Sequence, residues 1–359
     1  MKILQSLTVV ALLGVLAACA APPQAPGTDW ETLNTEVLEL YNAAKYDRAV
    51  DVATEALALA ETTRGPEHPD VAVSLNNLAM VYHAQGKFDL AEPLYQRAGG
   101  IMAKTFGLNH PAVATSLNNL AELNHARGWY AKAQDLHKLA LKIRERALGP
   151  DHPDVAVSLN NLAMAYQARG KPAEAEPLYH RALAIWEKTY GAEHPQVAIG
   201  LTNLAVLYRT QGQYSGAEPL YKRALAIQER AFGPKHPAVA INLDNLAVLY
   251  HEQGRDAEAE ALHQRALAIL EKALGPNHRE VAVSLNNLAE CYRAQGRYAE
   301  AEPFYTRALA IREKALGPEH PDVATSLTSL AALYRATDRI PAAEALEKRA
   351  AHIRYINNP

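Results

Sequence analysis

A histidine recurs every 42 residues along most of this chain of 359 residues. A glycine lies three residues before each histidine and keeps the same step, with no insertion or deletion between units. The histidines of this ladder are His68, His110, His152, His194, His236, His278 and His320. Self-similarity at a fixed period is typical of repeat proteins, in which each unit packs mainly against its neighbours. The sequence therefore predicts one array of stacked units, although its length alone would suggest two or three domains.

Each unit contains two amphipathic segments that are expected to be helices. Gly86 separates the two segments, and Gly107 is expected to end the second helix in a left-handed conformation. Pro69 suits the first turn of a helix, where a missing N–H costs little. The apolar positions at helical spacing are Leu75, Leu78, Ala79 and Tyr82 in the first segment and Ala91, Leu94, Tyr95 and Ala98 in the second. One such pair cannot bury both apolar stripes alone, so successive pairs must stack.

These positions resemble those of a tetratricopeptide repeat. The longer period, with the motifs Leu-Asn-Asn-Leu-Ala, Gln-Gly-Lys and Ala-Glu-Pro-Leu-Tyr, is similar to the kinesin light chain subclass. The resemblance covers about Gly65 to Thr337. It implies an all-α fold, a right-handed superhelical α-solenoid of antiparallel helix pairs with a concave inner face. It does not identify the ligand.

The two ends of the array depart from the regular pattern. Residues 29–64 read as a degenerate first helix pair, in which Glu36 stands where later units have leucine. Residues 65–337 hold the regular repeats, and residues 338–359 read as a C-terminal capping helix and tail, in which Glu347 replaces the recurrent tyrosine. Atypical end units are expected because their outer faces meet water.

The N-terminus has the features of a targeting sequence. Residues 1–18 have the charged start and short apolar run of a signal peptide, and the run is too short for a confident membrane span. The motif Leu16-Ala17-Ala18-Cys19 resembles a bacterial lipobox. This resemblance implies that Cys19 is lipidated, that residues 19–28 form a proline-rich tether, and that the protein is lipid-anchored in the cell envelope, at the outer membrane facing the periplasm. The alternative is an ordinary signal peptide with an incidental cysteine.

Composition and motifs argue against several classes of function. A net charge of −3 gives no basic excess, so no nucleic-acid partner is expected. Nucleotide-binding, metalloprotease and nucleophile motifs are missing from the sequence, so neither an enzyme nor a cofactor is expected. Helices pack about 8–10 Å apart, too far for histidines of successive units to share a metal ion. The ladder histidines are therefore expected to cap or pack on the next helix, and Cys291 is expected to fill a core position.

A row of asparagines is the main candidate for ligand contact. By resemblance to kinesin light chains, the second asparagine of Leu-Asn-Asn-Leu points into the groove and holds a peptide backbone. A side-chain amide offers both donors and an acceptor for that purpose. The alternative is that the asparagines bond neighbouring helices and hold the superhelical pitch, and both roles can coexist. The residues are Asn77, Asn119, Asn161, Asn203, Asn245 and Asn287.

Positions one turn away along the same helices vary between units and are expected to set specificity. One row is mostly apolar and would form the floor of the groove; it comprises Val73, Thr115, Val157, Ile199, Ile241, Val283 and Thr325. Arg209 and Arg293 suggest that the C-terminal half favours an acidic ligand segment, unless nearby carboxylates neutralise them; the candidates are Glu252, Asp244 and Glu290.

The sequence thus favours a membrane-anchored scaffold or adaptor that binds a protein or extended peptide in its groove. The alternatives are an assembly factor for a secretion, pilus or envelope complex, and a structural spacer without a discrete ligand. The sequence leaves the oligomeric state open.

Overall fold

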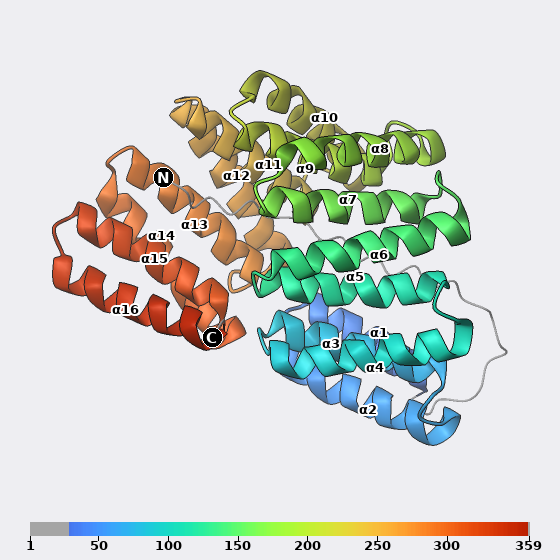
Figure 1. The fold of residues 1–359 in the computed structure, drawn as a ribbon. Coiled ribbons are helices and arrows are strands. Elements are labelled where there is room, and N and C mark those ends of the chain that lie inside the picture. The colour runs from blue at the N-terminus through green and yellow to red at the C-terminus, as the bar shows by residue number, and fades with distance from the viewer. Residues whose placement is uncertain (1–28, 358–359) are drawn as a thin grey trace.

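The structure, a computed structural model, describes residues 29–357, and within that range it contains 16 α-helices and no β-strand. The first helices of the pairs are α1 (Trp30–Asn42), α3 (Pro69–Ala84), α5 (Pro111–Ala126), α7 (Pro153–Ala168), α9 (Pro195–Thr210), α11 (Pro237–Glu252), α13 (Arg279–Ala294) and α15 (Pro321–Ala336). The second helices are α2 (Tyr46–Arg64), α4 (Phe88–Phe106), α6 (Tyr130–Leu148), α8 (Pro172–Tyr190), α10 (Tyr214–Phe232), α12 (Asp256–Leu274), α14 (Tyr298–Leu316) and α16 (Ile340–Asn357). The predicted right-handed solenoid of antiparallel helix pairs is confirmed (Figure 1).

Glycines end the helices at the predicted positions. Gly86 has φ +72° in the turn within a pair, and Gly107 has φ +87° in the turn between pairs, conformations that favour glycine. The prediction for Gly107 was right in φ but wrong in ψ, which is 156° and therefore extended rather than left-handed helical. After this glycine the chain makes a short turn, in which the N–H of the ladder histidine donates to the glycine carbonyl at 3.2–3.4 Å.

The ladder histidines cap the first helices, as predicted. In every regular unit the histidine Nδ1 accepts a hydrogen bond from the backbone N–H two residues further on, at 3.0–3.2 Å. An aromatic residue stacks on three of these rings, at centroid distances of 4.5–4.6 Å, in the pairs Phe106–His110, Tyr190–His194 and Phe232–His236. The recurrent histidine is thus explained by helix capping and local stacking.

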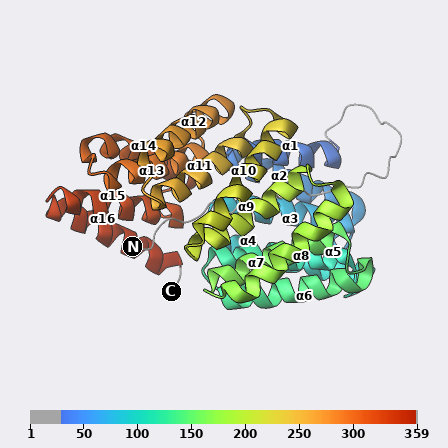
Figure 2. The same cartoon turned by 90° about the horizontal axis from the view of Figure 1, so that it is seen from above.

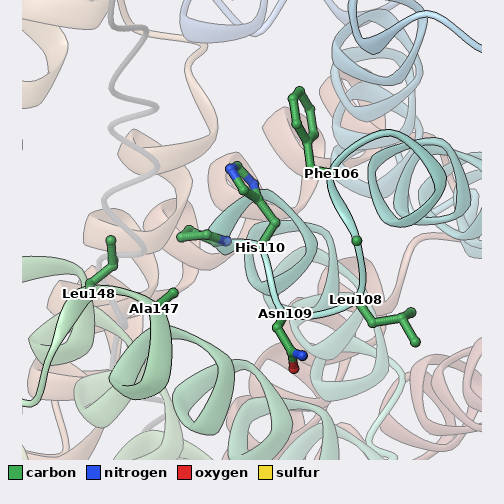
Figure 3. A pocket seen from close by; sticks show the side chains of 8 residues that line it. Phe106, Leu108, Asn109, His110, Ala147 and Leu148 are labelled. Carbon is green, nitrogen blue, oxygen red and sulfur yellow. The ribbon is translucent and has the colours of Figure 1, made fainter.

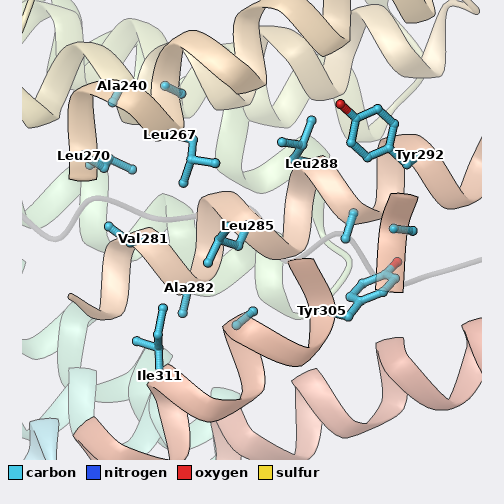
Figure 4. Close-up of a cluster of buried hydrophobic side chains, with 14 of the residues drawn as sticks. Ala240, Leu267, Leu270, Val281, Ala282, Leu285, Leu288, Tyr292, Tyr305 and Ile311 are labelled. Carbon is cyan, nitrogen blue, oxygen red and sulfur yellow. The ribbon is translucent and has the colours of Figure 1, made fainter. Parts of the chain in front are cut away.

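Alanines and tyrosines of successive pairs fill the core. Figure 4 shows one cluster, in which Leu285 and Leu288 of α13 lie between residues of α12, such as Leu267, and residues of α14, such as Tyr305. Ala301 is fully buried and lets α14 approach α13 closely, whereas Tyr305 fills the space between helices. Cys291 lies in a core cluster, 1% exposed, where it acts as the predicted small apolar residue, and burial raises the pKa of its thiol.

The odd-numbered helices line the inside of the curved array. Each odd-numbered helix contacts the next one, from α1 to α15, whereas no comparable contact joins successive even-numbered helices within residues 29–357. Elements on the inside of a curve lie closest together, so the odd-numbered helices form the inner layer and the even-numbered ones the outer layer. The outer layer is held by ion pairs that repeat with the unit, such as Arg181–Glu145 at 2.7 Å and Arg223–Glu187 at 2.7 Å.

The superhelix completes enough of a turn to bring its two ends together. Figures 1 and 2 show α13 to α16 returning toward the region of the first helices. Leu316 at the end of α14 belongs to the same buried apolar cluster as Leu33 and Val37 of α1. Units separated by most of the sequence are therefore in contact.

The predicted signal peptide, Cys19 and the tether lie outside the described residues. None of the helices formed by residues 29–357 has the length and apolar character needed to cross a bilayer.

Candidate functional site: the inner face of the solenoid

A stripe on each odd-numbered helix combines an apolar residue with an asparagine one turn later. Val157 and Asn161 on α7 are four residues apart, so they share one side of the helix. The apolar row predicted as the floor is half-buried in Val73, Val157, Ile199, Ile241, Val283 and Thr325, while Thr115 is exposed. These side chains keep part of their apolar surface accessible on preformed helices.

Three of the six predicted asparagines bond the preceding unit. The side-chain amide of Asn77 donates to the Oδ1 atom of Asn34 at 2.7 Å. The same bond joins Asn119 to Asn76 at 3.5 Å and Asn203 to Asn160 at 2.9 Å. Each bond links the second asparagine of one unit to the first-asparagine position of the unit before, which holds neighbouring inner helices together.

The other three asparagines differ in exposure. Asn161 and Asn287 are half-buried, and the Oδ1 atom of Asn161 accepts from Asn160 at 3.5 Å. Asn245 is 6% exposed, and its Nδ2 atom has no hydrogen-bond partner among the described residues. The row therefore has a structural role in some units and retains unused hydrogen-bonding capacity in others.

The two predicted arginines have carboxylate partners within the chain. Arg209, 6% exposed, binds the Oε1 atom of Glu252 at 2.5 Å, and Arg293 binds the Oε2 atom of Glu290 at 2.7 Å. The neutralisation anticipated as the alternative is thus present for Glu252 and Glu290, whereas Asp244 contacts His263 instead. A ligand carboxylate would have to compete with these internal partners.

The sequence analysis did not predict two buried histidine contacts. His263 takes the position of the recurrent tyrosine, and its Nδ1 atom lies 2.7 Å from Oδ1 of Asp244, with both side chains 2% exposed. His137 takes the same position three units earlier and contacts Asn118 at 3.0 Å, while Glu122 lies 3.7 Å away. Burial lowers the pKa of His137 to about 3 and raises the pKa of Glu122 to about 7, which keeps His137 neutral. The available signal was that Asp or Glu appears near the inner face in the units where histidine replaces tyrosine.

The solenoid edge carries a separate hollow. It lies at the turn between α4 and α5, has a volume of about 560 Å³, and is lined by residues that include Phe106, Leu108 and Leu148 (Figure 3). Leu108 is 73% exposed at a position where most units have proline. The hollow is not part of the inner face. Within residues 29–357, no group of three or more histidine, cysteine, aspartate or glutamate side chains is arranged to hold a metal ion.

Solved structures resemble this arrangement. BtubC (BKLC) of P. vanneervenii is 28% identical, with a TM-score of 0.51, over 66% of this chain and 92% of that chain. A putative kinesin light chain with nearly identical TPR-like repeats from Podosopora anserina is 32% identical, with a TM-score of 0.46, over 57% of this chain and 97% of its own. A Rap protein complexed with competence and sporulation factor is 16% identical and has a TM-score of 0.57, over 92% of this chain and 99% of its own, which shows a shared fold.

None of the curated proteins compared matches the sequence. The tetratricopeptide repeat model matches seven overlapping stretches, residues 40–102, 79–146, 112–182, 156–230, 203–272, 254–314 and 280–354. These matches follow the helix pairs from the end of α1 to α16 and indicate no catalytic family. The chain therefore belongs to the tetratricopeptide repeat family.

Proposed function

We propose that this protein is a membrane-anchored scaffold or adaptor, not an enzyme, whose inner face binds a protein or extended peptide. The observation that carries the proposal is the row of half-buried apolar side chains on successive inner helices. Tetratricopeptide repeats are protein-interaction scaffolds, which supports a partner of this class. A rigid surface of this kind binds with little ordering cost, because the helices that present it are already formed.

Affinity would come from apolar contacts, with hydrogen bonds fixing the direction of the bound chain. Ile199 of α9 and Ile241 of α11 lie at equivalent positions in neighbouring units, so they can contact successive side chains of one ligand. Asn161 and Asn287 retain amide groups that can pair with a ligand backbone. Asn77 and Asn203 contribute by holding the helices at a fixed spacing.

The anchor is a separate part of the proposal and rests on the lipobox at Cys19. A proline-rich tether of this length reaches on the order of 30 Å at about 3.1 Å per residue. We expect the wild-type protein to incorporate a radiolabelled fatty acid and to sediment with membranes. Cys19→Ser should abolish the label and release the protein from the membrane fraction, whereas equal labelling would refute lipidation at this residue.

A structural spacer is the second candidate, and the asparagine bonds between units favour it. Such a protein would use its inner face for internal cohesion and would have no discrete ligand. The two candidates differ in what they require of Ile199 and Ile241, because these side chains are only half-buried and a spacer has no need of their exposed surface.

The test is crosslinking and affinity capture from native membranes with paired variants. Ile199→Glu/Ile241→Glu places two carboxylates on the inner face. Leu90→Glu/Leu139→Glu places two on the outer helices, where the leucines are 50% and 47% exposed. The scaffold proposal expects a partner captured by the wild type and by the outer variant and lost by the inner variant. Circular dichroism must show unchanged helicity in both. Equal capture by both variants would remove the inner face from the binding account.

A further inference from the structure

The last regular unit is buried at positions that are more exposed in the other units. Phe106, Tyr190 and Phe232 end their second helices with 44–46% of the residue exposed. Leu148 and Leu274 occupy the same repeat position and are half-buried, but Leu316 is only 8% exposed. The position alone therefore does not explain the burial of Leu316. Its additional cover comes from the N-terminal helices, since Leu316 shares a cluster with Leu33, Val37 and Tyr46.

The ladder histidine of the same unit shows the same difference. The side chain of His320 is 10% exposed, whereas those of His68 and His152 are 40% and 41% exposed. The neighbour that covers it is Gly86, in the turn between α3 and α4. A Cβ atom added to Gly86 would lie 2.5 Å from the Cδ2 atom of His320. For Gly128, at the equivalent turn one unit later, no atom of the described residues other than its own chain neighbours lies within 4 Å of such a Cβ.

A third contact explains the one break in the histidine–proline pattern. Every ladder histidine is followed by proline except His278, which is followed by Arg279. The Arg279 side chain lies close enough to Tyr46, at the start of α2, for the two to interact electrostatically, and His278 lies close to the backbone of Asn42 at the end of α1. A proline could not make the contact to Tyr46. The exceptional residue thus lies where the two ends of the solenoid meet.

We propose that these contacts form a releasable clasp that holds the superhelix closed on itself, and that the protein alternates between this closed form and an open spiral. The clasp consists of Leu316, His320 and Arg279 from the last units and of Gly86 and Tyr46 from the first units. It is an intramolecular device and does not depend on the proposed partner, since it can be tested without one.

Release is expected because the clasp is small compared with the contacts between successive units. Neighbouring helices pack along their whole lengths, whereas the clasp is made by helix ends and turns. Small interfaces between parts of one chain permit relative motion by default. A solenoid also bends by small changes shared among many unit interfaces, so opening breaks no core of an individual unit.

Disulfide trapping tests the closed form. Gly86→Cys/His320→Cys places two cysteines across the clasp. Gly128→Cys/His320→Cys is the matched control, because it also removes the capping histidine of α15 and also replaces a glycine in the turn within a helix pair. Both carry Cys19→Ser and Cys291→Ala so that no other thiol competes. On oxidation, the first pair should form an intramolecular crosslink at least tenfold faster than the control. Equal rates would overturn the clasp.

Release is tested by adding Leu316→Asp to the trapping pair. Its control is Leu148→Asp, the same change at the same repeat position away from the clasp. Leu316→Asp should slow crosslinking severalfold and raise the radius of gyration measured by small-angle X-ray scattering, while Leu148→Asp leaves both close to the parent values. An unchanged crosslinking rate and radius with Leu316→Asp would show that the contact is not a clasp of this kind.

Discussion

The turns at Gly86 and Gly128 occupy the same place in successive units, yet they have different surroundings. Both glycines have positive φ, +72° and +80°, so the local conformation follows the repeat. Gly86 faces His320 from the far end of the chain, whereas Gly128 has open space beside it in the described structure. The middle of the solenoid is thus held by contacts that repeat, and its meeting ends are held by contacts that the repeat does not contain. Mutations should separate these two kinds of contact.

The largest expected effect lies in the middle, at the buried pair Asp244–His263. Removing one partner of a buried hydrogen bond leaves the other polar group unsatisfied, which costs about 1–3 kcal/mol and more where a carboxyl group is left buried. Asp244→Ala should therefore lower stability strongly in urea unfolding followed by circular dichroism. Asn286→Ala is the control at the equivalent position of α13. This asparagine is half-buried, and its Oδ1 atom has no hydrogen-bond partner among residues 29–357. Similar losses in both variants would contradict a special role for the pair.

Alanine substitutions in the asparagine row should have a smaller effect on the free energy of unfolding, and the loss should be greater in the middle of the solenoid than near its end. Asn203 is 4% exposed and donates to Asn160, so Asn203→Ala leaves a buried acceptor without its donor, at a cost of about 1–3 kcal/mol. Asn287 is half-buried, and its replacement by alanine should cost less. The same urea titration measures both. A greater loss for Asn287→Ala would mean that the bonds between units are not what stabilises the inner layer.

The two turns themselves can be compared directly. Gly86→Ala and Gly128→Ala each place a side chain at positive φ, which costs on the order of 1 kcal/mol. Gly86→Ala also meets the His320 ring, which is held in place by its 3.0 Å bond from the backbone N–H of Asp322. It should therefore raise the radius of gyration, while Gly128→Ala should not. Indistinguishable scattering curves would argue that the ends are not in contact in solution.

The smallest expected effect is the pH dependence of the closed form. Burial, followed by the charge of Arg279 and the neighbouring His320 and His125, lowers the pKa of His83 from 6.5 to about 4. The closed form therefore favours neutral His83. The contribution of neutral His83 to the stability of the closed form is fully present above pH 6.5. It is lost as the pH falls from 6.5 toward about 4. Crosslinking of the Gly86/His320 cysteine pair, normalised to the thiolate fraction, should slow over this range, and His83→Gln should flatten the response.

Much of the fold could be predicted from the sequence because the residues that determine it lie close together along the chain. The step of 42 residues and the apolar spacing predicted the helix pairs, the turn glycines and the capping histidines, and the structure confirms them. Each of these features is decided within one unit or between adjacent units. The extended ψ of Gly107 was missed because glycine permits several conformations at positive φ.

The contacts that sequence reasoning missed depend on accumulated geometry. The approach of His320 to Gly86 results from small rotations added over successive units, and no single unit specifies their sum. Arg279 was visible as an exception to the pattern, but its neighbour Tyr46 lies far away in sequence. The asparagine bonds were anticipated as an alternative; their register, from Asn203 to Asn160 across 43 residues, needed the structure.

Site-specific photocrosslinking tests the central proposal most directly. A photoreactive benzoylphenylalanine at Ile199 reports on the inner face, and the same residue at Leu139, which is 47% exposed on α6, reports on the outer face. Irradiation in native membranes should give a discrete protein adduct from position 199 that is missing from position 139. No adduct from position 199, or the same adducts from both positions, would contradict binding along the inner face and leave the solenoid as a spacer.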